Sequence, residues 1–153
     1  LPEVRGLMVG DGPERGALEA HRHALGLDDT VVVAGMRPNP VDEMHAADVV
    51  ALTSDWEGSP LVVAECLAVG RPLVTTAVGT VRRHLVDGEN ARIVAIGDPR
   101  AMADALVELL VDRSLAAAIG AAGQRVAAAV FDADRLTAAV AAVYRDIPRR
   151  TSR

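Results

Sequence analysis

The chain has 153 residues, of which 50% are hydrophobic and 24% charged, with 16 basic and 21 acidic side chains and a net charge of −5. This length suits one domain with its own core, and the composition excludes a disordered or collagen-like protein. The negative charge disfavours nucleic acid as a partner, and a single cysteine with four histidines excludes an internal disulfide and a zinc cluster of the usual spacing.

Short apolar runs alternate with helical patterns along the first half of the chain. In chain order they predict a strand at residues 4–9, a helix at 14–25, a strand at 30–34, a short helix at 41–47 and a buried strand at 48–53. A second set of signals predicts a helix at 60–69, with Ser59 as its N-cap, Pro60 at its first position and Gly70 after its end.

The second half begins with a strand at 73–76, followed by a polar loop that carries Arg82 and Arg83. A short strand at 92–95 precedes a helix that Asp98 caps and that ends near residue 111. Two further helices are expected at 115–130 and 134–147, with a frayed tail at 149–153. The last helix has one apolar stripe, formed by Leu136, Val140, Val143, Tyr144 and Ile147.

Apolar strands that alternate with helices are typical of a parallel sheet covered on both faces. We therefore expect an α/β fold with a Rossmann-like, doubly wound parallel sheet and C-terminal helices, as one domain over residues 1–153. Ligands of such sheets bind beyond the carboxyl ends of the strands, so the candidate loops lie at 10–13, 35–40, 54–60 and 76–83.

The segment from residue 54 to 69 carries the most informative polar residues. Glu57 comes just before the predicted helix, and Glu65 lies within a helix that is otherwise apolar. A carboxylate in that position either faces solvent, accepts a hydrogen bond from a structural donor, or accepts hydrogen bonds from the hydroxyl groups of a ligand. The free N–H groups at the start of the helix, with Gly58 beside them, suit a diphosphate, although Ser59 alone could satisfy them.

Seven ordered motifs resemble the C-terminal donor-binding domain of family 4 glycosyltransferases, and they span nearly the whole chain. The pattern includes a Glu-x7-Glu pair, Glu57 and Glu65. The motifs are Val9-Gly10-Asp11-Gly12-Pro13, Val33-Ala34-Gly35, Ala47-Asp48-Val49, Ser54-Asp55-Trp56-Glu57-Gly58, Leu61-Val62-Val63-Ala64-Glu65, Ala68-Val69-Gly70-Arg71-Pro72-Leu73-Val74 and Asp87-Gly88-Glu89-Asn90.

The resemblance implies one half of a GT-B enzyme, which transfers a hexosyl group from a nucleoside-diphosphate sugar with retention of anomeric configuration. It places Glu57 at the reacting centre and Glu65 on the ribose hydroxyls. The remaining donor contacts that we expect are Gly10, Gly12, Met36, Arg37, Gly58, Ser59, Pro60 and Leu61. No metal and no other cofactor is expected, because the helix dipole and basic side chains take the place of an ion in this family.

Two departures from the family pattern matter. The upstream arginine and lysine that neutralise the diphosphate have no match here, and Arg82 and Arg83 stand where the family tends towards Gly-Gly-x-Pro-Glu over residues 79–83. We therefore expect a fragment that lacks the N-terminal acceptor domain and the first strand and helix of its own domain. Such a fragment binds donor nucleotide but is inactive alone.

The chain has no apolar run of 18 residues and no signal-peptide start, so we expect it in the cytoplasm, with peripheral membrane association only through the absent domain. Two alternatives stay open. One is a non-catalytic nucleotide-binding or regulatory module of the same fold. The other is an NAD(P)-binding domain, which fits poorly because Arg15 holds the place of the third fingerprint glycine.

Overall fold

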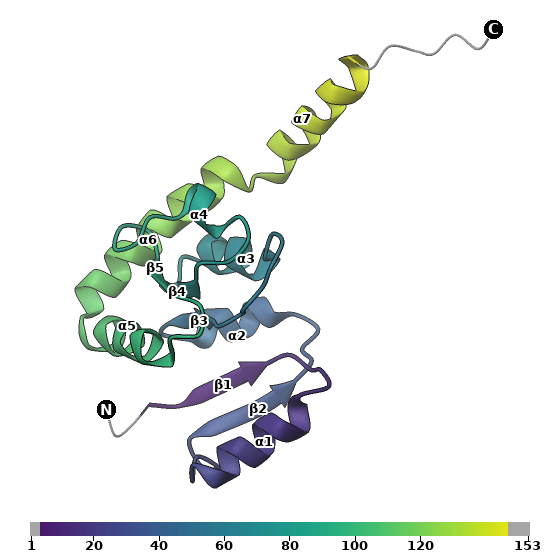
Figure 1. The fold of residues 1–153 in the computed structure, drawn as a ribbon. Helices are drawn as coiled ribbons and strands as arrows, with labels where there is room; N and C mark the ends of the chain where they lie inside the picture. The colour runs from purple at the N-terminus through teal and green to yellow at the C-terminus, as the bar shows by residue number, and fades with distance from the viewer. Residues whose placement is uncertain (1–3, 147–153) are drawn as a thin grey trace, which may run out of the picture. The chain divides into compact units, whose positions relative to one another are not determined.

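The computed structural model describes residues 4–146, and the chain divides into two compact units, the first up to Glu43 and the second from Met44. The first unit holds a two-stranded sheet of β1 (Gly6–Val9) and β2 (Val31–Gly35). The second holds a three-stranded sheet in the order β3 (Val50–Leu52), β4 (Leu73–Thr76), β5 (Arg92–Val94) (Figure 1). Every strand pair is parallel, which confirms the predicted α/β class.

In the first unit, α1 (Arg15–Ala24) follows β1 and runs alongside the two strands (Figure 1). The prediction of strands covered on both faces is wrong for β1, because Leu7, Met8 and Val9 are each at least 40% exposed. The physical reason is that, within the described part of its own unit, β1 has one neighbouring strand, β2, and one following helix, α1. The short helix α2 (Pro40–Ala46) begins at the end of this unit.

In the second unit, β4 is buried along its whole length and divides two hydrophobic clusters. Leu73 packs in one cluster with Cys66 and Leu67 of α3 (Leu61–Val69). The next residue, Val74, packs in the other, which is formed largely by α5 (Pro99–Val111) and α6 (Arg113–Val130). Successive side chains of a strand point to opposite faces, so both faces of β4 are covered. The prediction of a strand buried on both faces is therefore confirmed for β4.

Two of the four predicted helix-end residues, Gly70 and Asp98, act as predicted. Gly70 closes α3 in the left-handed conformation, with φ 78°, and the Asp98 carboxylate accepts from the Ala101 N–H at 2.9 Å to cap α5. The prediction of Ser59 as N-cap of α3 is wrong. Pro60 holds that position, no side chain caps the helix, and the Ser59 hydroxyl instead accepts from the Thr80 hydroxyl at 3.2 Å.

Two segments of the second unit differ from expectation in extent. The polar loop after β4 contains a short helix, α4 (Val81–His84), because Val81 and Leu85 are buried and anchor it to the core. The predicted buried strand at 48–53 is shorter, and β3 is only half-buried because it lies at one edge of its sheet.

The last described element is α7 (Ala133–Asp146), and none of its residues is buried. Four residues of the predicted apolar stripe, Leu136, Val140, Val143 and Tyr144, are exposed, while Ile147 and the tail at 149–153 lie outside the described residues. Within residues 4–146, no helix is both long and apolar enough to cross a membrane.

The approach of α6 to the end of α3 depends on Gly120. A Cβ at this position would lie 2.3 Å from the Gly70 carbonyl oxygen, which is backbone and cannot move aside without shifting the helix. We expect Gly120→Ala to lower the free energy of unfolding by about 1–3 kcal/mol, the usual cost of overpacking. Thermal unfolding followed by circular dichroism measures this change.

The neighbouring substitution Ala121→Ser provides the control, because Ala121 is exposed on the same helix. It should leave the midpoint nearly unchanged. Equal midpoints for both variants would show that α6 does not pack on α3 in this way.

Burial governs the chemistry of Cys66, which is fully buried with its Sγ 3.5 Å from the Arg71 carbonyl oxygen. Desolvation raises the pKa of this thiol from 9.0 to about 12, and the nearby Arg71 charge only partly opposes the shift. The folded state therefore holds the proton more tightly than the unfolded state, so stability should fall as pH rises from 9 towards 12.

A Cys66→Ala variant should lack this part of the alkaline decline in melting temperature. The thiol of the native chain should also resist alkylation at pH 8 and react at the ordinary rate in denaturant. Rapid alkylation of the native chain would contradict the buried placement.

Candidate functional site

Glu57 lies on the loop that joins β3 to α3. Its side chain is half-buried, and its Oε1 accepts a hydrogen bond from the Ser54 hydroxyl at 2.9 Å. Gly58 follows it in the open, since a Cβ added there would meet nothing within 4 Å. The carboxylate is thus held on one side by Ser54, next to a stretch of backbone that a ligand is free to approach.

The first turn of α3 begins directly after this loop. Pro60 is its N-cap residue, and no side chain caps the backbone N–H groups of the turn. Leu61 is 75% exposed, so the turn is open to solvent. Uncapped N–H groups and the helix dipole together favour an anion at this position.

Glu65 lies one helical turn after Leu61, on the same face of α3. The opposite face is buried through Val63, Cys66 and Leu67, whereas Glu65 is half-buried. Among the residues that the structure describes, Glu65 takes part in no ion pair. Glu57 also forms no ion pair there, but one of its carboxylate oxygens accepts the hydrogen bond from Ser54. The Glu65 carboxylate therefore keeps its acceptor capacity for a ligand.

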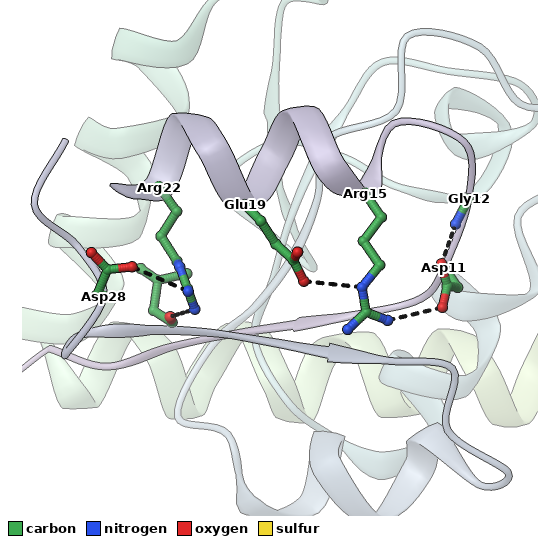
Figure 2. Close-up of polar contacts among 7 residues, drawn as sticks. Asp11, Gly12, Arg15, Glu19, Arg22 and Asp28 are labelled. Carbon is green, nitrogen blue, oxygen red and sulfur yellow. Dashed lines mark hydrogen bonds and ion pairs between the residues drawn. The ribbon is translucent and has the colours of Figure 1, made fainter. Parts of the chain in front are cut away.

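In the first unit, the candidate loop at residues 10–13 forms hydrogen bonds and an ion pair with nearby side chains. The Gly12 N–H donates to Asp11 Oδ1 at 2.8 Å, and the Arg15 guanidinium lies between Asp11 Oδ2 at 2.9 Å and Glu19 Oε1 at 3.0 Å (Figure 2). These hydrogen bonds and charges raise the pKa of Arg15. Arg15 is thus already paired with two carboxylates.

The carboxyl ends of β1 and β2 meet at Gly10 and Gly35, because the Gly10 N–H donates to the Gly35 carbonyl oxygen at 2.9 Å. A Cβ on Gly35 would lie 2.7 Å from the Arg15 guanidinium, and the residue has φ +70°. Met36 follows with 72% of its side chain exposed, and Arg37 pairs with Glu43 at 3.3 Å.

The predicted site residues are divided between the two units. The loop and helix of the second unit group Glu57, Gly58, Ser59, Pro60, Leu61 and Glu65. The first unit holds the other four, Gly10, Gly12, Met36 and Arg37.

Sequence reasoning missed Ser54, which directly contacts the Glu57 carboxylate. A hydroxyl three residues before a glutamate in a loop was the available signal. Across the described part of the chain, no group of three His, Cys, Asp or Glu side chains is placed to hold a metal ion.

Comparison with known proteins places this geometry in context. The profile of the family described as glycosyl transferases group 1 matches residues 1–112. D-inositol 3-phosphate glycosyltransferase of Xylanimonas cellulosilytica is 40% identical over 98% of this chain. The chain spans only 37% of the length of that relative.

Solved structures resemble the chain at the level of the whole fold. The structure of Anabaena Alr3699/HepE in complex with UDP superposes with a TM-score of 0.91 at 25% identity, over 96% of this chain and 42% of that one. The C-terminal domain of a group 1 glycosyl transferase, LpcC, from Francisella tularensis superposes with a TM-score of 0.74 at 24% identity, over 86% of this chain and 72% of that one. The second likeness concerns the fold alone.

Proposed function

The chain belongs to the group 1 glycosyltransferase family, and from this premise we propose that it is the donor-binding half of a retaining hexosyltransferase. The donor is a nucleoside-diphosphate sugar, and an N-terminal acceptor domain completes the enzyme. The observation that carries the proposal lies on one loop and helix. It combines the Ser54-bound Glu57, the uncapped first turn of α3, and Glu65, which forms no ion pair with the residues that the structure describes.

Each part of that segment has a chemical role in the proposal. Glu65 accepts hydrogen bonds from the two ribose hydroxyls, because a carboxylate can grip a vicinal diol with both oxygens. The backbone from Gly58 through Ser59 and Pro60 to Leu61 holds sugar hydroxyls and the diphosphate. As the bond between sugar and diphosphate breaks, the N–H groups of α3 stabilise the charge that grows on the leaving group without a metal ion.

Glu57 lies beside the reacting carbon of the donor sugar in this proposal, where its negative charge stabilises the positive charge that develops on the sugar ring. The Ser54 hydrogen bond fixes one carboxylate oxygen and leaves the other for the substrate. For the first unit, the proposal assigns Met36 and Arg37 to the base. Gly10 and Gly12 contribute open space and not hydrogen-bond donors, because a Cβ on either would meet nothing within 4 Å and their N–H groups already donate to Gly35 and Asp11. The isolated chain then binds nucleotide but does not turn over.

The dinucleotide-binding alternative is weakened by the first unit. A dinucleotide fingerprint needs backbone N–H groups that face a pyrophosphate, yet the Gly12 N–H already donates to the Asp11 carboxylate (Figure 2). The non-catalytic alternative keeps the nucleotide site and loses the reaction. It predicts nucleotide binding without glycosyl transfer by the parent protein.

Calorimetric titration of the chain with UDP, GDP, ADP and NADPH tests the proposal. UDP is the first choice because the similar Anabaena structure contains it. We expect one nucleoside diphosphate to bind equally well with and without magnesium, and NADPH not to bind. Binding of NADPH alone would overturn the proposal in favour of a redox domain.

A further inference from the structure

The loop that follows β4 contacts the Glu57 loop at several points, and we propose that Ser54, Thr76 and Gly79 are positioning residues that set the place and direction of the Glu57 carboxylate. This inference rests on the proposed function, in which Glu57 lies at the reacting centre. None of the three residues needs to touch the substrate, because each acts through Glu57 or the backbone beside it.

The first contact starts at the carboxyl end of β4. Thr76 is 4% exposed, and its hydroxyl donates to the Ser54 carbonyl oxygen at 2.6 Å. The Ser54 hydroxyl in turn donates to Glu57 Oε1 at 2.9 Å. Two hydrogen bonds, one to the backbone of Ser54 and one from its side chain, thus connect a buried strand to the carboxylate. Since β4 is the most buried strand of its sheet, it provides a rigid base for these two hydrogen bonds.

The second contact lies on the other side of Glu57. The Thr80 N–H donates to the Gly58 carbonyl oxygen at 3.1 Å, which fixes the backbone one residue after Glu57. This bond requires a close approach at Gly79. A Cβ there would lie 2.3 Å from the backbone carbonyl oxygen of Gly58 and 2.6 Å from the backbone carbonyl oxygen of Glu57. Gly79 also has φ +51°, a conformation that other residues rarely adopt.

Glu57 is therefore held from both sides by the end of β4 and the loop that follows it, through Thr76 and Ser54 on one side and Gly79 on the other. Such support matters for a reacting group, because misplacement by about 1 Å can reduce turnover 10²-fold without abolishing substrate binding. The expected signature is a loss in kcat that exceeds any change in the KM for the donor.

The test uses the intact parent protein with Thr76→Val, Thr76→Ser and Ser54→Ala. We expect Thr76→Val and Ser54→Ala each to lower kcat about tenfold, the effect of losing one hydrogen bond, with KM for the donor changed less than about threefold. Thr76→Ser keeps the hydroxyl and should retain most of the parent kcat. Gly79→Ala should lower kcat at least as much.

Thr30→Val is the matched control, because the Thr30 hydroxyl also donates to a carbonyl oxygen, that of Leu27 at 3.3 Å, outside the proposed site. It should leave kcat unchanged, and circular dichroism should show all variants folded. Equal losses in Thr76→Val and Thr76→Ser would overturn the inference, since packing and not the hydroxyl would then be responsible.

The result for Glu57→Ala separates this inference from the proposed function. If Glu57→Ala abolishes turnover while Ser54→Ala and Thr76→Val leave kcat at the parent value, the positioning role fails and the proposed function stands. If Glu57→Ala leaves turnover unchanged, the proposed function itself fails.

Discussion

Glu57→Ala, made in the intact parent protein, is expected to lower kcat by about 10²–10³-fold while the affinity for the donor changes by less than tenfold. The side chain accepts a hydrogen bond from Ser54 and lies beside open backbone at Gly58. In the proposed mechanism, its negative charge serves the transition state, in which positive charge builds up on the sugar, more than it serves the ground state. Steady-state kinetics with varied donor concentration measures both quantities.

Asp55→Ala is a suitable control for this experiment, because Asp55 is an exposed carboxylate two residues earlier on the same loop. It removes the same charge without the Ser54 contact, and kcat should stay within about threefold of the parent value. Unchanged turnover in Glu57→Ala would make Glu57 a structural residue and contradict its proposed role at the reacting centre.

Glu65→Gln is expected to weaken binding of the nucleoside diphosphate by about 1–3 kcal/mol, which corresponds to roughly 5–150-fold in Kd. Glutamine keeps the shape of the side chain but replaces one charged acceptor oxygen by a donor, so one ribose hydroxyl loses its partner. The half-buried position of Glu65 reduces competition from water for those hydrogen bonds. Calorimetric titration of the chain measures the change.

Glu89→Gln provides the matched control for that experiment. Glu89 is an exposed glutamate of the same unit, so its substitution changes the net charge equally. It should alter Kd by less than about twofold. A Glu65→Gln variant that binds as tightly as the parent chain would remove the ribose role.

The parts of the fold that were predictable from the sequence are those that local chemistry decides. Strand β4 reads as an unbroken apolar and β-branched run, and it is buried on both faces. Gly70 and Asp98 end and begin their helices through interactions within a few residues. For the two helix ends the partner lies nearby in the sequence, so the pattern contains the information.

The errors arose where distant residues decide the outcome. Ser59 reads as an N-cap by composition, but the Thr80 hydroxyl, 21 residues further along, donates to it and Pro60 takes the cap position. The apolar run of β1 reads as buried, yet burial depends on how many neighbours the strand has. Helix α4 lies in a polar stretch and forms because Val81 and Leu85 pack into the core.

The same distinction applies to the candidate site. Glu57 and Glu65 are candidates from the sequence alone because a carboxylate just before or within an apolar helix stands out in the residue pattern. The hydrogen bond from Thr76 to the backbone of Ser54 joins residues 22 positions apart. Only the parallel pairing of β3 with β4 brings those two residues together, and a single sequence does not specify that register.

The most direct test of the central claim is to follow the backbone amide NMR signals of the ¹⁵N-labelled chain during titration with the nucleoside diphosphate that binds in calorimetry. The account predicts that signals of Gly58, Ser59 and Leu61 shift most, together with those around Glu65, because the diphosphate lies on the first turn of α3. Binding without any shift between residues 58 and 65 would contradict the claim that this segment is the donor site.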